Sequence, residues 1–421
     1  MFLLYNLLLT VLSPIWLVWM IVRARRRKEQ PNWTERQGMY DIPKRGERKR
    51  VWLHTVSVGE FVAATPLLKE LRRTLPNYEI VVSVTTSSGH QTARDAEAGL
   101  FDHLVYFPID VARFQLSAMQ KVRPDVVAIM ETELWMNFLW AAKVMGARTV
   151  LVNGRISDRN FRISKHLRFY YRALLKEMDR CLMQSPADLE RIQLLGARDA
   201  TVLGNMKFDQ AVQGLDADPV EWKQKLGLDA SRCTLVVGST RGEEEERLVI
   251  AAIKQVGLDR LNVIHAPRHL ERVDSLAALV KQETGAVALR SKGETGPYVI
   301  LDTYGELSSI YCVSDLVVIG GGFENLGGQN LIQPLAHGKP VLHGPYMQNF
   351  RDSAAMADVA GAAQVCRTAE ELAAAIKELL DDPAKRKLAG DAARELVAQN
   401  LGATKRYAET IALEATKADS R

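Results

Sequence analysis

Two carboxylates in the first half of the chain stand where apolar segments end. Glu60 closes the run His-Thr-Val-Ser-Val-Gly-Glu just before a helical pattern, and Glu131 follows the apolar segment Val126–Met130. Partial burial beside a sheet raises the pKa of a carboxylate, which then suits general acid or base catalysis. A carboxylate at the start of a helix also complements the helix dipole. The spacing alone leaves both roles open for each residue.

A lysine lies near the end of the same half of the chain. Lys207 stands between the apolar residues Met206 and Phe208. A lysine without a function on a solvated surface is the ordinary case. The apolar flanks and the position at the close of a domain instead favour a place beside an interdomain cleft.

Glycine-rich segments follow apolar segments in the second half of the chain. They include Gly238–Gly242 and Gly320–Gly328, and the second precedes a helical stretch. Glycines before a helix N-terminus expose backbone N–H groups that can hold a phosphate. The first βα turn lacks the GxGxxG fingerprint, and no GxxxxGK[ST] loop occurs. The pattern therefore predicts an anion site that is neither a dinucleotide fingerprint nor a Walker P-loop.

Short apolar runs alternate with amphipathic ones beyond residue 50, which is typical of parallel sheets covered by helices on both faces. The predicted strands are Val51–Val56, Ile80–Thr85, Val126–Met130, Thr149–Val152, Cys181–Met183, Thr234–Val237, Asn262–His265, Val299–Leu301, Leu316–Ile319 and Pro340–Leu342. An interruption from residue 203 to about residue 222 divides them. We therefore expect an α/β fold of two doubly wound, Rossmann-like domains with a cleft between them. Ligands of such sheets bind at the carboxyl ends of the strands.

The formal net charge of +5 over 421 residues is unevenly distributed. Residues 1–22 are uncharged and mostly apolar, whereas residues 23–50 carry eleven basic and four acidic side chains. A helix over the apolar run would be about 33 Å long, close to the thickness of a bilayer core. Because the cations follow this run, the positive-inside rule predicts an anchor helix with the rest of the chain in the cytoplasm. A buried N-terminal helix is the alternative.

The predicted organisation has five parts. They are an N-terminal anchor with a basic collar (1–30), a first domain (31–212), a linker (213–222), a second domain (223–400) and a helical tail (401–421). Four widely separated cysteines without ligand spacing indicate reduced thiols and no zinc site. The one Asp-x-Asp triplet, Asp216–Asp218, lies in the linker, so no metal is expected.

A second basic region covers residues 155–180, which carry eight cations and three acids. Arg155, Arg162, Lys165 and Arg172 belong to it, and aromatic residues lie between them. This pattern favours a surface for phosphorylated lipid or membrane headgroups. A solvated helix face is the alternative. Nucleic acid fits less well, because the remaining body is acidic overall.

The motifs resemble those of the 3-deoxy-D-manno-octulosonic acid (Kdo) transferases, inverting glycosyltransferases of the GT-B fold in Gram-negative bacteria. In chain order they are Ser57–Glu60, Glu131–Trp135, Lys207–Asp209, Pro267–His269, Gly305–Leu307 and Gly320–Gln333. The resemblance covers essentially the whole chain. It implies CMP-Kdo as donor and the lipid A precursor as acceptor, without a metal or other cofactor. It also implies a location on the cytoplasmic face of the inner membrane, among its lipids.

The resemblance further implies a role for each matching residue. Glu60 falls on the family's general base, while Glu131 and Lys207 fall on positions assigned to transition-state stabilisation. A carboxylate favours the oxocarbenium character of the Kdo ring, and a cation favours the departing phosphate. The positions that match CMP contacts are Pro267, Arg268, Tyr304, Gly305, Glu306, Asn330, Leu331, Ile332 and Gln333.

The chain departs from the family pattern at two positions. Gln333 replaces a glutamate that would accept hydrogen bonds from the ribose hydroxyls; its amide oxygen still accepts, without the charge. Met136 replaces a proline after Trp135, which is the milder change. Two other functions stay open: a GT-B enzyme with a different nucleotide sugar, and a non-catalytic, membrane-tethered protein that binds anionic lipid.

Overall fold

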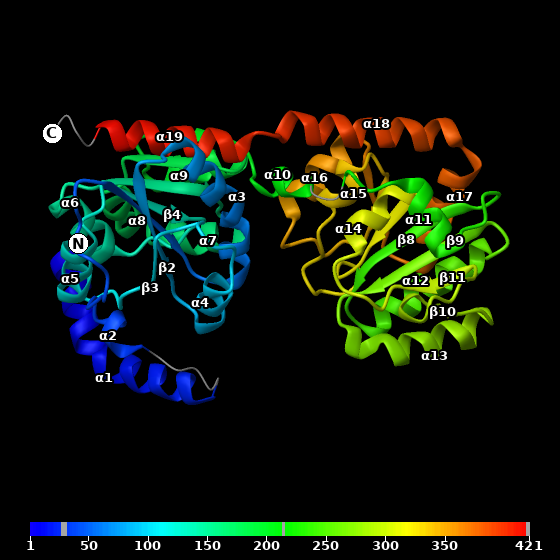
Figure 1. Cartoon of the computed structure of the whole chain (residues 1–421), viewed down its shortest axis with the longest axis horizontal. Helices are drawn as coiled ribbons and strands as arrows, with labels where there is room; N and C mark the ends of the chain where they lie inside the picture. The colour runs from blue at the N-terminus through cyan, green and yellow to red at the C-terminus, as the bar shows by residue number, and fades with distance from the viewer. Residues whose placement is uncertain (27–31, 213–214, 418–421) are drawn as a thin grey trace. The chain divides into compact units, whose positions relative to one another are not determined.

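The computed structural model describes residues 1–26, 32–212 and 215–417, and it holds two seven-stranded sheets (Figure 1). The strand pairs in both sheets are parallel. Internal contacts divide the chain into two compact units. The first contains residues 1–209 together with 402–421, and the second contains residues 210–401.

The first sheet has the strand order β3-β2-β1-β4-β5-β6-β7. Its strands are β1 Lys49–Thr55, β2 Tyr78–Val84, β3 His103–Tyr106, β4 Val126–Met130, β5 Arg148–Gly154, β6 Arg180–Met183 and β7 Ala200–Val202. Because β1 lies between β2 and β4, the direction of winding reverses at the β1/β4 pair. In open parallel sheets, ligands bind beside such a reversal.

Helices cover both faces of the first sheet. Buried side chains of α3 (Val58–Thr74), α4 (Ser87–Arg94) and α19 (Ala403–Lys417) pack on one face. Those of α5 (Ala112–Val122), α6 (Met136–Val144), α8 (Arg168–Leu175) and α9 (Pro186–Leu195) pack on the other. The remaining helices of this part are α1 Phe2–Arg26, α2 Trp33–Arg36, α7 Asp158–His166 and α10 Lys207–Ala211.

The second sheet has the order β10-β11-β9-β8-β12-β13-β14, and its winding reverses at the β8/β12 pair. Its strands are β8 Cys233–Thr240, β9 Leu261–Pro267, β10 Ala288–Leu289, β11 Tyr298–Ile300, β12 Leu316–Ile319, β13 Val341–His343 and β14 Ala363–Val365. Its helices are α11 Pro219–Leu226, α12 Glu243–Val256, α13 Val273–Thr284, α14 Leu307–Ile310, α15 Ile332–Ala336, α16 Arg351–Val359, α17 Ala369–Asp381 and α18 Pro383–Asn400, with short 3-10 turns η1 Leu270–Arg272, η2 Arg290–Lys292 and η3 Tyr311–Val313.

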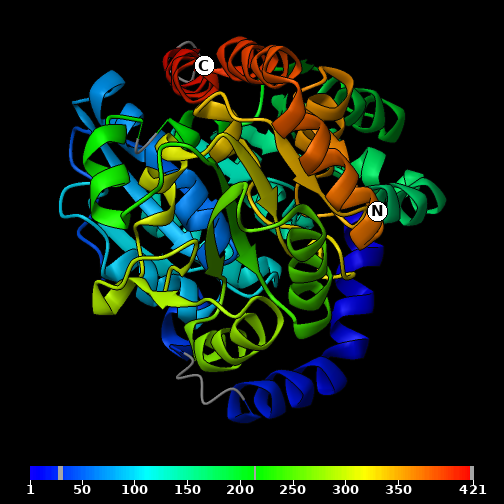
Figure 2. The ribbon, with the colours of Figure 1, turned by 90° about the vertical axis from the view of Figure 1, so that its right-hand side faces the viewer.

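One core cluster of the second unit lies under α12, α13 and α17. Helices α15, α16 and α17 each contact α18, the long orange-red helix at the top of Figure 2. The expected α/β class with two wholly parallel sheets is therefore confirmed. All ten predicted strands are present, and β4 and β12 have the predicted bounds.

The predicted hydrophobic anchor helix is not seen as such in the residues described. Helix α1 forms, but the described part of the chain contains no helix that is long and apolar enough to cross a membrane. The first turns of α1 contact the body instead. The Tyr5 hydroxyl donates to Asp110 Oδ2 at 2.7 Å, and Asn6 Nδ2 donates to Asn137 Oδ1 at 2.8 Å. Residues 27 and 28 of the basic collar lie outside the described residues, as do the side chains of the collar arginines before them.

The C-terminal tail belongs to the first unit. Helix α19 packs against α3, β4 and β5 (Figure 1). Tyr407 is fully buried there and donates its hydroxyl hydrogen bond to Gly204 O at 2.9 Å. The predicted linker also contains structure, because the Asp218 side chain caps α11 by accepting the Val220 N–H at 2.9 Å.

Candidate active site

Glu60 lies in the first turn of α3, directly after β1. Ser57 caps this helix by accepting the Glu60 N–H at 3.4 Å, and Glu60 Oε2 accepts the Val56 N–H at 2.8 Å. This reciprocal arrangement is a variant of the capping box. Burial raises the pKa of Glu60 to about 7, and the nearby charges of Glu131 and Glu133 add to the effect. The residue therefore caps a helix and also has the pKa of a base that works near neutral pH.

Glu131 follows β4 with an unusual backbone conformation. Its φ is 57°, in the left-handed region that residues other than glycine seldom adopt, and its N–H donates to Val152 O at 2.9 Å. Such a conformation costs on the order of 1 kcal/mol or more and persists where the surroundings enforce it. Burial also raises the pKa of Glu133, with a contribution from the charge of Glu131. A group of three neighbouring carboxylates thus lies at the β1/β4 reversal.

Asn153, near the end of β5, helps to position Lys207. It also has a positive φ, 54°, and its Oδ1 accepts the Met206 N–H at 3.3 Å. Asn205 Oδ1 accepts the Lys207 N–H at 3.0 Å, while Phe208 is buried. Lys207 therefore begins α10 at the carboxyl edge of the first sheet, the same edge that carries Glu60 and Glu131.

The loops after β8 and β12 flank the reversal of the second sheet and are tied together by Glu245. Its carboxylate accepts the N–H groups of Arg241 at 2.9 Å and Gly321 at 2.8 Å. Gly320 must lack a side chain, because a Cβ there would meet Thr240 Cα at 2.6 Å. These two loops form a compact, hydrogen-bonded edge in which backbone N–H groups precede helices.

The expected donor contacts stand on neighbouring loops of the same edge. The Arg268 N–H donates to Thr240 O at 2.8 Å, which joins the loop after β9 to the end of β8. Glu306 stands directly before α14, and its carboxylate accepts from Arg290 Nη2 at 3.0 Å. Asn330 Oδ1 accepts the Ile332 N–H at 3.0 Å at the start of α15. The rest of the set comprises Pro267 at the end of β9, exposed Tyr304 beside Gly305, buried Leu331 and Ile332, and half-buried Gln333.

The predicted basic surface is divided between two helices. Arg162 and Lys165 are exposed on α7, and Arg172 is exposed on α8, while Arg155 is half-buried after β5. Helix α7 ends at His166 and α8 begins at Arg168, so the regular spacing seen in the sequence runs across a helix break.

Asn153 and Glu245 are supporting residues that the sequence interpretation did not identify. Asn153 had no visible signal, because its role depends on a backbone conformation and on Met206, which is 53 positions away. Glu245 had a weak signal. It is one of four consecutive glutamates in the first turn of α12. Its carboxylate accepts the N–H of Gly321 in the glycine-rich loop.

The chain is similar to known sequences over nearly its full length. Residues 31–210 match the family model of 3-deoxy-D-manno-octulosonic-acid transferase (kdotransferase). The 3-deoxy-D-manno-octulosonic acid transferase of Bordetella pertussis is 33% identical over 97% of this chain and 98% of that protein. The chain belongs to the Kdo transferase family. It is therefore a glycosyltransferase.

Two further similarities agree with this membership. The family transferase of Haemophilus influenzae is 27% identical over 97% of each chain. A glycosyltransferase structure from Rickettsia africae shares the fold, with a TM-score of 0.61 and 13% identity over 88% of this chain and 98% of that one. The similarity to Kdo transferase sequences thus extends over both units of the chain.

Proposed function

We propose that the chain transfers Kdo from CMP-Kdo to the lipid A precursor by an inverting, metal-independent reaction in which Glu60 is the general base. The observation that carries this proposal is the pKa of Glu60, raised to about 7 by burial and by nearby carboxylates. An ordinary surface glutamate is too weak a base to deprotonate a sugar hydroxyl effectively near neutral pH. Oε2 is engaged by the Val56 N–H, and Oε1 would receive the proton.

Glu131 and Lys207 act on the charges that develop as the bond to Kdo breaks. The anomeric carbon becomes electron-poor, and the carboxylate of Glu131 stabilises it. The phosphate of CMP gains negative charge, and Lys207 stabilises that charge. The loop Gly320–Gln333 and the start of α15 receive the nucleotide, with Glu306 and Gln333 as acceptors for polar groups of CMP.

The test is turnover by Glu60→Gln, which keeps the size of the side chain and an acceptor for the Val56 N–H. We expect Kdo transfer to fall at least about 10³-fold, measured by mass spectrometry of the lipid A precursor after incubation with CMP-Kdo. The control is Glu70→Gln on the same helix, where the carboxylate pairs with Arg73. Undiminished transfer by Glu60→Gln contradicts the proposed base. Stronger thermal protection by UDP or ADP than by CMP contradicts the donor.

We also propose that α1 lies along the cytoplasmic face of the inner membrane. Its exposed residues include Leu3, Leu7 and Val11, which share one face at helical spacing. The opposite face carries Tyr5 and Asn6, which contact the body. Exposed apolar side chains on a helix beside cationic segments favour an interfacial position.

Vesicle binding tests this location. The triple variant Leu3→Glu/Leu7→Glu/Val11→Glu is expected to lose co-sedimentation with anionic phospholipid vesicles. The control is Val359→Glu, because Val359 is 90% exposed in the second unit and far from α1 in the sequence. Equal co-sedimentation of the triple variant and the wild type rules out α1 as the attachment.

A further inference from the structure

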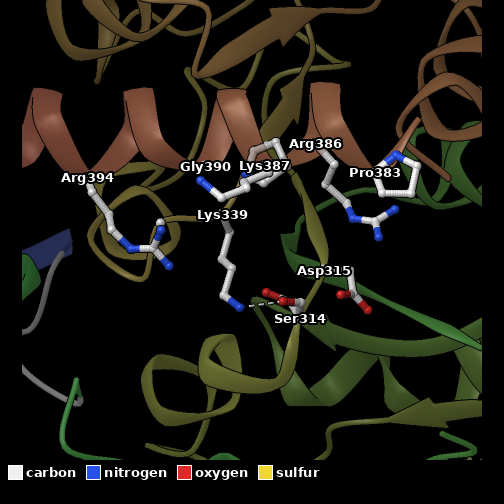
Figure 3. Close-up of a pocket in the computed structure, with 10 residues that line it drawn as sticks. Ser314, Asp315, Lys339, Pro383, Arg386, Lys387, Gly390 and Arg394 are labelled. Carbon is white, nitrogen blue, oxygen red and sulfur yellow. Dashed lines mark hydrogen bonds between the residues drawn. The ribbon is translucent and has the colours of Figure 1, made fainter. Parts of the chain in front are cut away.

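A basic hollow of about 240 Å³ lies between α18 and the loops that precede β12 and β13 (Figure 3). Its lining comprises Ser314, Asp315, Gly338, Lys339, Pro340, Pro383, Arg386, Lys387, Gly390 and Arg394. The five residues from α18 stand at positions i, i+3, i+4, i+7 and i+11 and so share one helix face. All ten belong to the second unit, so the hollow is complete within that unit.

The hollow is separate from the proposed donor site. Asp315 directly precedes β12, and Lys339 and Pro340 directly precede β13. These are the amino ends of the strands, whereas the donor loops leave the carboxyl ends. The hollow therefore lies at the opposite edge of the same sheet, and none of its residues belongs to a family motif identified in the sequence.

Positive charge dominates the lining. Lys339, Arg386, Lys387 and Arg394 are cationic, and Asp315 is the one carboxylate among the lining residues. Asp315 Oδ2 is already engaged, because it accepts the Thr234 N–H at 2.7 Å. Asp391, beside the hollow, pairs with both Lys387 and Arg394. Four cations against these two carboxylates still leave an excess of positive charge.

The ammonium group of Lys339 is held by two hydrogen bonds and has a third proton to donate. Its ammonium donates to Ser314 O at 2.5 Å and to Cys312 O at 3.2 Å, and an ammonium carries three protons. Both acceptors are neutral carbonyls, and burial lowers the pKa of Lys339 despite the attraction of Asp315. An anion in the hollow would take the third hydrogen bond and supply the missing charge.

The arginines extend from α18 on either side of Lys339 (Figure 3). Each has one anchored nitrogen. Arg386 Nη1 donates to Leu379 O at 2.6 Å, and Arg394 Nη1 donates to Asp391 Oδ1 at 3.2 Å. A guanidinium has five N–H donors, so both retain donors for a ligand. Close backbone contact holds the helix in place, because a Cβ on Gly390 would meet Gly338 O at 2.5 Å.

We propose that this hollow is a binding site for a small, free phosphate-bearing anion, of the size of inorganic phosphate or pyrophosphate. Its volume is below the roughly 300–1,000 Å³ of sites for drug-sized ligands, which favours a small ligand. Two guanidinium groups and an ammonium are the groups that proteins use to hold phosphate oxygens. The site goes beyond the proposed transfer reaction and does not depend on it.

Calorimetric titration of the full chain with pyrophosphate, and separately with inorganic phosphate, tests the site. CMP is present at saturation, and chloride at matched ionic strength is the reference. We expect specific binding to the wild type and an affinity at least tenfold weaker in Arg386→Gln/Arg394→Gln. The matched control is Lys385→Gln, on the same helix but outside the lining, which should bind as the wild type does.

Two results would overturn the proposal: no binding beyond the chloride reference, or equal affinity in the double variant and the wild type. The second result would mean that the anion binds elsewhere on the protein, whichever nucleotide sugar proves to be the substrate. Lys387→Gln serves if the double variant does not fold, because Lys387 is an exposed side chain on α18 and its loss leaves the packing intact. It should weaken pyrophosphate binding measurably, and unchanged affinity counts against the site.

Discussion

The carboxylate of Asp209 accepts the backbone N–H of Thr404 at 2.6 Å, and its other oxygen accepts that of Gly402 at 2.6 Å. This contact joins positions 195 residues apart. It fixes the start of α19 to α10, which begins at Lys207. Because α19 packs on α3, the residue proposed as the cation and the helix proposed to carry the base share one support. The motif Lys-Phe-Asp therefore combines the proposed cation, a core residue and a helix cap.

Replacing Asp209 with alanine is expected to lower both stability and turnover. The variant loses two charge-assisted hydrogen bonds at a helix start, which corresponds to about 1–3 kcal/mol. Urea denaturation measures the first effect, and steady-state kcat measures the second. Asp209→Asn keeps one acceptor oxygen and should give an intermediate loss. An unfolding free energy equal to that of the wild type contradicts the capping role.

Glu60→Gln is expected to be more stable than the wild type at high pH. The pKa of Glu60 is about 7 in the folded protein, above the ordinary value of about 4.3 for an unfolded chain. Below about pH 4 both states hold the proton, so the two proteins should be equally stable. Between about pH 4 and pH 7 the unfolded chain releases this proton while the folded wild type still holds it, so the wild type loses roughly 1–3 kcal/mol of stability that Glu60→Gln keeps.

Thermal unfolding of both proteins at pH 4 and pH 8 measures this difference. Glu70→Gln is the control, because Arg73 holds the pKa of Glu70 below its ordinary value. Removal of that carboxylate should lower stability slightly at pH 8. A Glu60→Gln protein that gains nothing between pH 4 and pH 8 shows that the Glu60 pKa is not raised.

The pH dependence of kcat/KM should report the same group. The base acts when deprotonated, so the rate should rise through an acid limb near pH 7. Glu133→Gln removes a charge that helps to raise the pKa of Glu60, so the limb should move to lower pH. The control is Glu70→Gln, which should leave the acid limb in place. Gln115→Glu would not serve as a control, because Gln115 is buried. If the acid limb of Glu133→Gln stays near pH 7, the charge of Glu133 does not contribute to the raised pKa of Glu60.

Two variants of Glu131 can separate the effect of its backbone conformation on stability from the effect of its carboxylate on activity. Glycine adopts a φ of 57° without steric cost, so Glu131→Gly should keep or raise the unfolding free energy by up to about 1 kcal/mol. Glu131→Val should lower it, because a β-branched residue tolerates this conformation poorly. Both variants should lose most transfer activity. Denaturant titration with a turnover assay distinguishes these outcomes, and full activity in Glu131→Gly removes the carboxylate from the mechanism.

Gln333→Glu tests the departure from the family pattern. The residue lies in the first turn of α15, where a negative charge complements the helix dipole. A carboxylate also accepts hydrogen bonds from ribose hydroxyls more strongly than an amide does. We expect a lower KM for CMP-Kdo with kcat nearly unchanged. A raised KM would mean that the glutamine suits the nucleotide better here.

The strands that could be predicted from the sequence are the ones inside the sheets. All four missed strands, β3, β7, β10 and β14, lie at sheet edges. An interior strand is covered on both faces and reads as a continuous apolar run. An edge strand is shorter and partly exposed: no residue of β7 or β14 is buried. Nothing in their apolar pattern distinguishes them from loops.

The sequence predicts where the site residues lie, but it does not predict which other residues hold them in place. Glu60 could be placed because it follows an apolar run that forms β1. Lys207 could be placed because apolar residues flank it at the close of the first domain. The residues that fix them act through contacts distant in sequence, as Asn153 does with Met206 and Asp209 with Thr404. The composition of the N-terminal segment predicts a hydrophobic anchor helix, but Tyr5 and Asn6 of this helix form hydrogen bonds with polar groups of the body.

The discontinuity of the first unit has a consequence for synthesis. The ribosome completes residues 210–401 before it makes α19, although α19 is needed to cover α3, β4 and β5. Until Tyr407 and Ile411 emerge, an apolar surface of the first unit stays open to water. The first unit is therefore completed after the second, although most of its residues are translated first. The unit that carries Glu60 thus becomes whole only with the last helix.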